Sequence, residues 1–419
     1  MKILIPTDSF PPVCGGSGWS THALAAGLRS RGHDVTIVRP VQRAVEDVTT
    51  SSYDGFAVIE FGFRAPAVPY VRNYFKNERL YARLANFLEQ RIRTNYFDVV
   101  HAQHVMTTLP SIAAAAKTGV PSVATVRDYW PVCYWSDLIH TRDEDALCPG
   151  CSAGMMTRCI QPRAGTMWPL ALPMIPYMRA NLTRKRQGLA AAGAVIAVSS
   201  RIASDLRNRA PELATTRLEI IPNPVDLADL RARARGGRRE IEGPYALYLG
   251  KLAPNKGTNH LVEVAEAASL DWPLVIAGDG PDRDAIAVAA AASARDIRLL
   301  GWVDRERAVG LMAHASMLVF PSRGPESLSR VLLEACALGI PVAAMNTGGT
   351  PDIIVQGESV LLSSNAAELA RDVRALREDE ALRSQLSAGA RRHIEQRFDA
   401  TAVIDRIDTL YRELIGERR

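Results

Sequence analysis

Short apolar runs, each followed by a polar segment and then by a helical pattern, recur along the whole chain. In the first half these runs are KILIP at residues 2–6, FDVVHAQ at 97–103, PSVATVRD at 121–128 and AVIAVSS at 194–200. Apolar runs that alternate with helices predict parallel strands whose faces are covered by helices. We therefore expect a doubly wound α/β domain, with ligand-binding positions where its strands end.

The pattern breaks near residue 222, where prolines, a glycine pair and basic residues follow one another, and then it starts again. The second series comprises ALYLG at 246–250, PLVIAGDG at 273–280, DIRLLGWV at 296–303, HASMLVFPS at 314–322 and PVAAMNTGG at 341–349. This predicts an N-terminal domain over 1–222, a C-terminal domain over 223–398, and a last helix over 399–419 that packs back on the first domain. Two doubly wound domains that face one another form a cleft, which is the default place for a ligand.

Length and composition agree with this picture and exclude several other classes. A chain of 419 residues suggests two domains of about 200 residues each. Hydrophobic residues make up 47% and aromatic residues only 6%, which is typical of an Ala-, Val- and Leu-rich globular protein and not of a disordered or fibrous one. The net charge of +5 comes from arginines spread along the chain, so no nucleic-acid partner is expected.

The N-terminus lacks the cationic and apolar segments of a signal peptide, and no apolar run reaches the roughly 18 residues that span a bilayer. We therefore expect a cytoplasmic location. Residues 166–186 leave a peripheral contact with the inner face of the membrane open, because apolar and aromatic residues there precede Arg179, Arg184, Lys185 and Arg186. An ordinary helix packed on the first sheet would have the same pattern.

Two lysines stand on the loop after the first strand of the second series. The segment GKLAPNKG places Lys251 and Lys256 just before a predicted helix. Two ammonium groups beside a helix N-terminus suit a diphosphate, since the charges and the oriented N–H groups attract the same anion. Two solvated surface lysines remain the alternative.

The segment PESLSRVLLEACALG at 325–339 contains two glutamates, Glu326 and Glu334. If its helix begins near Ser327, a good N-cap residue, the two α-carbons lie roughly 12 Å apart along the axis and on nearly the same face. That span suits the distance from the ribose to the sugar of a nucleotide sugar. A solvated helix face is the alternative, but Glu334 lies among residues that should be buried, where an unpaired carboxylate is costly. The glycines of NTGGTPD at 346–352 then allow either a close approach to a ligand or a plain turn.

Together these segments resemble the retaining glycosyltransferases of family 4, which have the GT-B fold of two Rossmann-like domains facing across a cleft. The resemblance runs nearly end to end, through PPVCGGSG, VIAVSS, IIPNPVD, LGKLAPNKG, VIAGDGP, LLGWV and VFPSRGPESLSRVLLEACALGIPVAAMNTGGTPDII. It implies that Glu334 binds the donor ribose and that Glu326 holds hydroxyls of the transferred sugar. The other donor-binding positions that it implies are Gly15, Gly16, Lys251, Lys256, Val303, Ser327, Leu328 and Ser329.

The implied activity is transfer of a sugar, of the hexosyl class, from a UDP- or GDP-sugar to an acceptor with retention of configuration. Polysaccharide, glycolipid or glycoconjugate biosynthesis would use such a reaction, and the acceptor would be lipid-linked or soluble. The lysines would neutralise the leaving diphosphate without a divalent ion. The catalytic candidates are Glu326, His101 and Arg127, with His104 a further candidate for acceptor contacts.

Three departures from the family pattern keep other functions open. Arg127 stands where the family often has histidine, Ser329 replaces a frequent glycine, and Pro224 replaces another in the linker. Arginine cannot act as a base near neutral pH. A catalytically impaired nucleotide-binding protein of the same fold is therefore one alternative. A Rossmann oxidoreductase is a weaker one, because GGSGWSTHA lacks the third glycine of the dinucleotide motif.

Four of the six cysteines lie within an apparent insertion over about residues 130–160: Cys133, Cys148, Cys151 and Cys159. Disulfides are disfavoured in a cytoplasmic chain, whereas separate core thiols remain open. Four thiolates can also hold a structural Zn²⁺ or a [4Fe–4S] cluster, and one C-x2-C step is present. We expect such a metal site, with zinc and iron–sulfur undecided.

Overall fold

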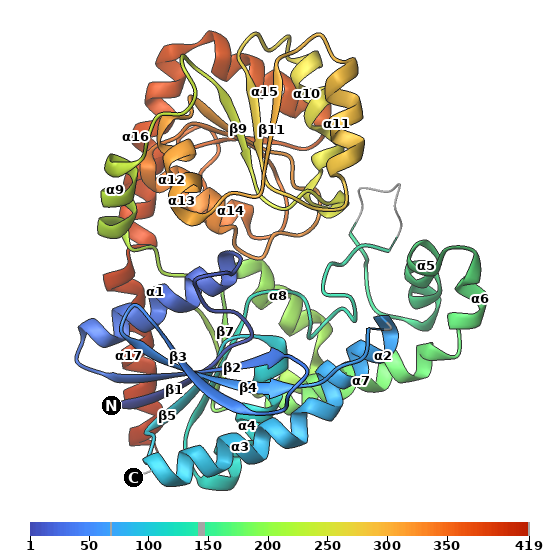
Figure 1. Ribbon diagram of the computed structural model, residues 1–419, viewed down its shortest axis with the longest axis vertical. Coiled ribbons are helices and arrows are strands. Elements are labelled where there is room, and N and C mark those ends of the chain that lie inside the picture. Colours follow the sequence, from blue (N-terminus) through green and yellow to red (C-terminus); the bar gives the residue numbers. More distant parts are fainter. Residues whose placement is uncertain (68, 141–146, 418–419) are drawn as a thin grey trace. The chain divides into compact units, whose positions relative to one another are not determined.

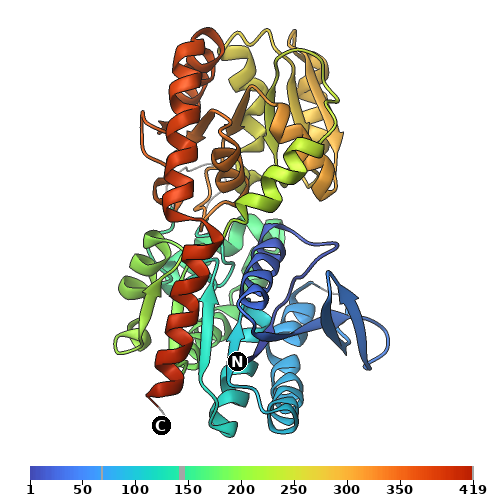
Figure 2. The same cartoon turned by 90° about the vertical axis from the view of Figure 1, so that its left-hand side faces the viewer.

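The structure is a computed structural model that describes residues 1–67, 69–140 and 147–417. The chain divides into two compact units, each built around its own sheet (Figures 1 and 2). The first unit comprises Met1–Ser136, Gly150–Pro224 and Ala400–Arg419, and the second comprises Asp137–Pro149 and Val225–Asp399. The prediction of two doubly wound α/β domains is confirmed.

The sheet of the first unit has the strand order β3-β4-β2-β1-β5-β6-β7-β8. All neighbouring pairs are parallel except β3 and β4. The strands are β1 (Lys2–Pro6), β2 (Asp34–Gln42), β3 (Val48–Tyr53), β4 (Phe56–Phe63), β5 (Val99–Ala102), β6 (Ser122–Val126), β7 (Ala194–Ala197) and β8 (Leu218–Ile220). The chain order reverses between β1 and β5, so the carboxyl ends of these two strands flank the place where such sheets bind ligands.

Helices cover both faces of this sheet (Figure 1). They are α1 (Gly16–Ser30), α2 (Pro69–Tyr74), η1 (Phe75–Arg79), α3 (Leu80–Asn95), α4 (Val105–Thr118), α5 (Ala153–Ala164), η2 (Gly165–Met167), α6 (Trp168–Ala171), α7 (Met174–Ala190), α8 (Ser200–Arg209), η3 (Pro211–Leu213) and α17 (Ala400–Gly416). In β1, Ile3 and Ile5 join the core formed with α1 and α17, whereas Leu4 joins the core formed with α3 and α4. The alternation of side chains along a strand therefore explains why three successive residues, Ile3, Leu4 and Ile5, are all apolar.

The sheet of the second unit is parallel throughout, with the order β11-β10-β9-β12-β13-β14. Its strands are β9 (Ala246–Leu249), β10 (Leu274–Ala277), β11 (Ile297–Gly301), β12 (Met317–Phe320), β13 (Val342–Met345) and β14 (Leu361–Ser363). This is the order of the dinucleotide-binding sheets, and it reverses between β9 and β12. The loops that follow β9 and β12 are therefore the expected place for a ligand.

The helices of the second unit are α9 (Leu227–Gly236), η4 (Pro254–Lys256), η5 (Thr258–His260), α10 (Leu261–Ala267), α11 (Arg283–Ala292), α12 (Arg305–His314), α13 (Arg330–Leu338), α14 (Thr350–Ile353), α15 (Ala366–Glu378) and α16 (Glu380–Arg397). The side chain of Asn365 caps α15 and that of Asp379 caps α16, so the long helical pattern near the C-terminus forms separate helices. Among the helices of the described residues, none has the length and apolarity needed to cross a membrane.

Candidate functional site

The loops after β9 and β12 bring Lys256 and Glu326 together at the reversal point of the second sheet. Lys256 ends η4, and its Nζ donates a hydrogen bond of 2.6 Å to Oε1 of Glu326. The hydroxyl of Ser322 donates to the same oxygen. Glu326 is only 6% exposed, so this carboxylate is buried beside a cation and a hydroxyl donor. A cation and an acceptor of hydroxyl hydrogen bonds thus share one place at the carboxyl edge of the sheet.

Two glycines allow the backbone around this pair to pack closely. Gly257 has φ of +63°, and a Cβ there would come within 1.9 Å of the carbonyl oxygen of Pro321. Gly348 has φ of +55°, and a Cβ there would meet the carbonyl oxygen of Glu326 at 2.0 Å. The next N–H, of Gly349, donates to that carbonyl at 2.6 Å. The glycine pair of NTGGTPD therefore fixes the backbone of Glu326, which is a close approach within the chain itself.

Glu334 is a buried carboxylate that pairs with two arginines. Its side chain is 3% exposed, and it accepts hydrogen bonds of 2.6 Å from Nη1 of Arg305 and from Nε of Arg330. Burial opposes the negative charge, but the attraction of Arg330 and Arg305 outweighs it and lowers the pKa of Glu334. Glu334 is therefore an ionised hydrogen-bond acceptor held in place by two cations.

Neither arginine was among the residues expected from the sequence. The sequence did contain a signal for Arg330, because Arg330 lies four residues before Glu334, a spacing that pairs side chains on a helix. Arg305 is the first residue of α12 and lies far from Glu334 in the chain. Only the parallel arrangement of the strands brings those two segments to one edge of the sheet.

The helix that carries Glu334 begins later than expected. α13 starts at Arg330, and the hydroxyl of Ser329 caps it by accepting a hydrogen bond from the N–H of Leu332. The prediction that Ser327 is the N-cap is therefore wrong, and with it the axial distance calculated between the two glutamates. Ser327 is half-buried and Leu328 is buried, both in the turn between Glu326 and the helix.

The remaining positions expected to bind the donor in the second unit lie on the same edge. Lys251 follows β9, and its side chain is exposed. Val303 is half-buried between β11 and α12, next to Trp302, which is 63% exposed. Asp304 caps α12 by accepting a hydrogen bond from the N–H of Arg307. Lys251, Lys256, Val303, Glu326 and Glu334 thus all follow strands of one sheet, although their roles toward a ligand stay predictions.

In the first unit, the predicted glycines begin the first helix after β1. Gly15 is the N-cap of α1 and Gly16 is its first residue, and both are exposed. Nothing lies within 4 Å of the place that a Cβ of Gly15 would take. Packing within the unit does not explain this glycine. An exposed helix N-terminus of this kind attracts anions.

His101 lies inside β5 and not at its end. Its side chain is completely buried, with Nδ1 hydrogen-bonded to the hydroxyl of Tyr411 and Nε2 to that of Thr125 at 2.7 Å. Burial, assisted by Arg127, lowers the pKa of His101 well below its usual value. Both ring nitrogens are therefore used within the core, and the geometry supports a packing role for this histidine.

Arg127 does lie at the end of β6, as expected. Its Nε donates to Oδ1 of Asn223 at 2.9 Å, and Nη1 donates to the carbonyl oxygen of Gln103 at 3.1 Å. These bonds hold the guanidinium against the segment that leaves the first unit, and a catalytic role for Arg127 stays a prediction.

Two carboxyl groups at the strand ends of the first unit were not among the expected site residues. Asp8, after β1, accepts a hydrogen bond from the N–H of Met106 at 3.0 Å, and burial raises the pKa of Asp8 to about 7. Asp128, after β6, accepts from the N–H of Trp130 at 2.8 Å, and burial raises its pKa to about 6. His104 accepts from the N–H of Asp8 at 3.3 Å through Nδ1, and burial lowers its pKa to about 3. The sequence contained a signal for both residues, because Asp8 lies just after one predicted strand and Asp128 ends another.

The structure gives no support to a metal site at the cysteines. Among the described residues, no three His, Cys, Asp or Glu side chains are placed to hold a metal ion. Cys148 belongs to the second unit, whereas Cys133, Cys151 and Cys159 belong to the first. Cys159 lies in an apolar cluster with Met156 and Leu182, and Cys151 packs against that cluster. Cys151 and Cys159 therefore pack among apolar groups, and the expectation of zinc or an iron–sulfur cluster is not supported by the described residues.

The fold and these strand-end residues agree with what the comparison with known proteins shows. Two structures are similar over nearly the whole chain. Sucrose-phosphate synthase from Thermosynechococcus elongatus has a TM-score of 0.68 at 19% identity and covers 100% of both chains. Anabaena HepE, solved with UDP-glucose, has a TM-score of 0.67 at 18% identity and covers 99% of this chain and 100% of its own. These similarities show the GT-B fold.

A curated relative and two families extend the comparison to sequence. Glycogen synthase of Mycobacterium tuberculosis is 26% identical over 422 residues, which are 95% of this chain and 91% of the relative. The family described as Glycosyl transferases group 1 matches residues 234–393. The family described as Glycosyltransferase Family 4 matches residues 14–229, more than half of the chain. The resemblance found in the sequence is thereby confirmed: the chain is a glycosyltransferase and belongs to glycosyltransferase family 4.

Proposed function

We propose that this glycosyltransferase moves a hexosyl residue from a UDP-sugar to a hydroxyl group of its acceptor, with retention of configuration. The observation that carries the proposal is the Lys256–Glu326 pair, buried where the strand order of the second sheet reverses. The UDP-glucose complex of HepE supports the choice of donor. The glycogen synthase of M. tuberculosis supports a hexosyl group.

The diphosphate is assigned to the two lysines. Lys251 is exposed on the loop after β9, and Lys256 lies in the same loop. Two fixed positive charges neutralise the charge that develops on the leaving diphosphate, so the transfer needs no divalent ion for that purpose. The exposed N-terminus of α1, at Gly15 and Gly16, presents N–H groups that suit an anion.

Glu326 is assigned to the transferred sugar. Before the donor binds, Lys256 is held by Glu326 at 2.6 Å. A phosphate that takes over part of the interaction with Lys256 leaves the carboxylate to accept hydrogen bonds from sugar hydroxyls. Binding of the diphosphate and binding of the sugar are therefore coupled through this one ion pair.

Glu334 is assigned to the ribose. The carboxylate is held ionised by Arg305 and Arg330, and it has four lone-pair sites to share between those cations and two neighbouring hydroxyls. We infer that the acceptor attacks from the face on which the diphosphate leaves. Arg127, a permanent cation bonded to Asn223, does not serve as the base.

Two measurements on the full chain test this function. A thermal-shift screen with UDP, GDP, ADP and their glucose conjugates should give the largest stabilisation with UDP and UDP-glucose, because a ligand that binds only the native state raises its melting temperature. Donor hydrolysis should then follow the same preference. Glu326→Gln should abolish most of the hydrolysis and keep the melting temperature of the unliganded protein within a few degrees.

The matched control is Glu263→Gln, since the side chain of Glu263 is 68% exposed on α10 of the same unit. A larger shift with GDP or ADP would overturn the assignment of the base. Tight binding of nucleotide without turnover of any donor would instead favour the catalytically impaired protein.

A further inference from the structure

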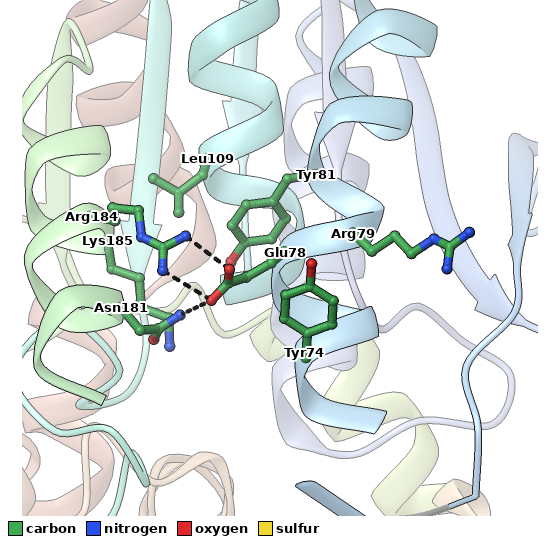
Figure 3. A pocket seen from close by; sticks show the side chains of 8 residues that line it. All are labelled: Tyr74, Glu78, Arg79, Tyr81, Leu109, Asn181, Arg184 and Lys185. Carbon is green, nitrogen blue, oxygen red and sulfur yellow. Dashed lines mark hydrogen bonds and ion pairs between the residues drawn. The ribbon is translucent and has the colours of Figure 1, made fainter. Parts of the chain in front are cut away.

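The first unit contains a polar cavity that the donor site does not use. Its volume is about 410 Å³, and it lies between the segment α2–η1–α3 on one side and α7 on the other, with α4 behind (Figure 3). The residues that line it are Tyr74, Glu78, Arg79, Tyr81, Leu109, Asn181, Arg184 and Lys185. We call it the α3–α7 pocket.

Glu78 forms the polar centre of the α3–α7 pocket. Its carboxylate accepts hydrogen bonds from Tyr177 at 2.6 Å, from Asn181 at 3.0 Å and from Arg184 at 2.8 Å. Burial alone would raise the pKa of Glu78, but these donors lower it. Figure 3 shows Arg184 and Asn181 directed at this carboxylate, whereas Arg79 extends away from it. The wall of the pocket is therefore prearranged and charged before any ligand binds.

Two other polar groups of the pocket are left without a hydrogen-bond partner, and a buried ammonium group lies beside them. The hydroxyl of Tyr81 and Oδ1 of Asn181 are buried and make no hydrogen bond with the described residues. Lys185 is 5% exposed and forms no ion pair with the described residues, and its Nζ lies 5.8 Å from the centre of the Tyr134 ring. Burial lowers its pKa to about 8, although Asp128 partly counteracts this. Buried polar groups without partners cost free energy, so their presence at one cavity points to a polar ligand.

The chemistry of that ligand follows from the groups that are unsatisfied. A buried ammonium group requires an anion, and a phosphate also suits the neighbouring Arg184. Tyr81 and Asn181 offer partners for hydroxyl groups. A second cavity of about 190 Å³ shares Asn181 and Lys185 and adds the aromatic rings of Tyr134, Trp135 and Tyr177. Apolar ring faces beside a few polar groups are typical of small-ligand sites.

We propose that the α3–α7 pocket binds the acceptor, and that the acceptor is a polyhydroxylated ring bearing a phosphate group. Lys185 and Arg184 hold the phosphate, and Tyr81, Asn181 and Glu78 hold ring hydroxyls. The pocket lies near the strand ends of the sheet, because the second cavity, which shares Asn181 and Lys185, is also lined by Val105, the first residue of α4 after β5. This assignment rests on the proposed transferase function.

Calorimetric titration of the full chain with glucose 6-phosphate, glucose 1-phosphate, glucose and inorganic phosphate tests the proposal. At least one sugar phosphate should bind, with glucose and phosphate at least about tenfold weaker. Lys185→Met should weaken sugar-phosphate binding by about 10- to 100-fold, since a hydrogen bond to a charged group is lost. Tyr81→Phe, which removes only the hydroxyl, should weaken it by about 2- to 10-fold.

The matched controls are Lys117→Met and Tyr96→Phe, in the same unit, whose side chains are exposed. Their binding should equal that of the unchanged protein. Tyr81→Phe should not melt at a lower temperature, because it removes a buried hydroxyl that makes no hydrogen bond with the described residues. Equal binding of glucose and of its phosphates, or unchanged binding in both pocket variants, would overturn the proposal.

A ring that bears a phosphate occurs both in soluble sugar phosphates and in lipid headgroups. Flotation with phosphatidylcholine vesicles, with and without phosphatidylinositol, distinguishes these two sources. Binding that requires phosphatidylinositol and is lost in Lys185→Met would support the pocket with the ring and phosphate carried by a lipid. The sugar-phosphate titration and the donor-hydrolysis assay test the pocket and the transferase function separately. Hydrolysis of UDP-glucose without sugar-phosphate binding would overturn only the pocket, whereas sugar-phosphate binding without turnover of any donor would overturn only the transferase proposal.

Discussion

The two units place acidic residues at the strand ends of similar parallel sheets but give them opposite partners. In the second unit, Glu326 is paired with Lys256, and Glu334 with two arginines. In the first unit, Asp8 and Asp128 accept hydrogen bonds from backbone N–H groups in buried surroundings. The pKa of Glu334 is consequently lowered, whereas those of Asp8 and Asp128 are raised to about 7 and about 6.

This difference in pKa distinguishes carboxyl groups that suit ligand binding from those that suit proton transfer. A carboxylate held by cations keeps one charge state over the physiological range and suits the recognition of fixed hydroxyl groups. A carboxyl group whose pKa lies close to neutral can take up or release a proton there. We therefore interpret Glu334 as a permanently charged group, and Asp8 and Asp128 as pH-sensitive ones.

The largest effect is expected from removing the charge of Glu334. Glu334→Ala removes the buried carboxylate that Arg305 and Arg330 both bond, and breaking a buried ion pair costs about 3–5 kcal/mol. The free energy of unfolding, from urea titration, should fall by that amount. Asp128→Asn in the first unit should cost less at neutral pH, because Asp128 forms no salt bridge with the described residues and loses only a longer-range attraction to Lys185. Equal stability losses in the two variants would contradict the contrast between the units.

The next largest effect concerns the two lysines. Lys256→Met should lower kcat/KM for UDP-sugar hydrolysis by about 100-fold, because it removes a charge from the leaving group and also a partner of Glu326. Lys251→Met, at an exposed position on the same loop, should lower it by about tenfold, since only one charged hydrogen bond is lost. A larger loss for Lys251→Met would reverse the assignment of these two residues.

A pH titration of stability should distinguish the units further. The folded state raises the pKa of Asp8 from 3.8 to about 7, mainly through burial. The stability that comes from keeping this group protonated is therefore fully present below about pH 4 and is lost as the pH rises to about 7. Glu334, with a lowered pKa, gives the opposite trend, because its contribution is present at neutral pH and is lost on acidification.

The variant Asp8→Asn isolates the first trend. Its free energy of unfolding should fall less with rising pH than that of the unchanged protein, by at most about 1.4 kcal/mol per pH unit for one proton. Unfolding measured between about pH 5 and about pH 8 gives this slope. Parallel pH profiles of the two proteins would show that Asp8 titrates at its ordinary value.

The sequence predicted those parts of the fold that depend on local pattern. The runs that became β1, β9, β12 and β13 are short, apolar and followed by polar residues, so their place in parallel sheets and the ligand-binding edge followed directly. The residues at those edges, including Lys256 and Glu326, were found for the same reason. Their pairing was not predicted, since it depends on how two separate loops pack around Gly257 and Gly348.

Other expectations failed because several residues compete for one role. Ser327 and Ser329 are both good N-cap residues, and only the backbone of the preceding turn selects Ser329. His101 lies near the end of an apolar run, but side chains alternate between the two faces of β5 and this one points into the core. There it is hydrogen-bonded to the hydroxyls of Tyr411 and Thr125. The cysteine spacing allowed a metal site, yet Cys159 packs with apolar side chains of α5 and α7. For His101 and Cys159 a long-range contact decided the outcome, whereas for Ser329 the local turn did.

The smallest expected effect compares two helix caps, one in each unit. Ser329 caps α13 and Ser199 caps α8, each by accepting the N–H three residues ahead. Serine to alanine at either position should cost about 1 kcal/mol of unfolding free energy, because one helix N–H loses its acceptor. Ser329 also lies three residues after Glu326, on the turn assigned to the transferred sugar. Ser329→Ala should therefore raise KM for the UDP-sugar while Ser199→Ala leaves it unchanged, and equal KM values would remove Ser329 from the donor site.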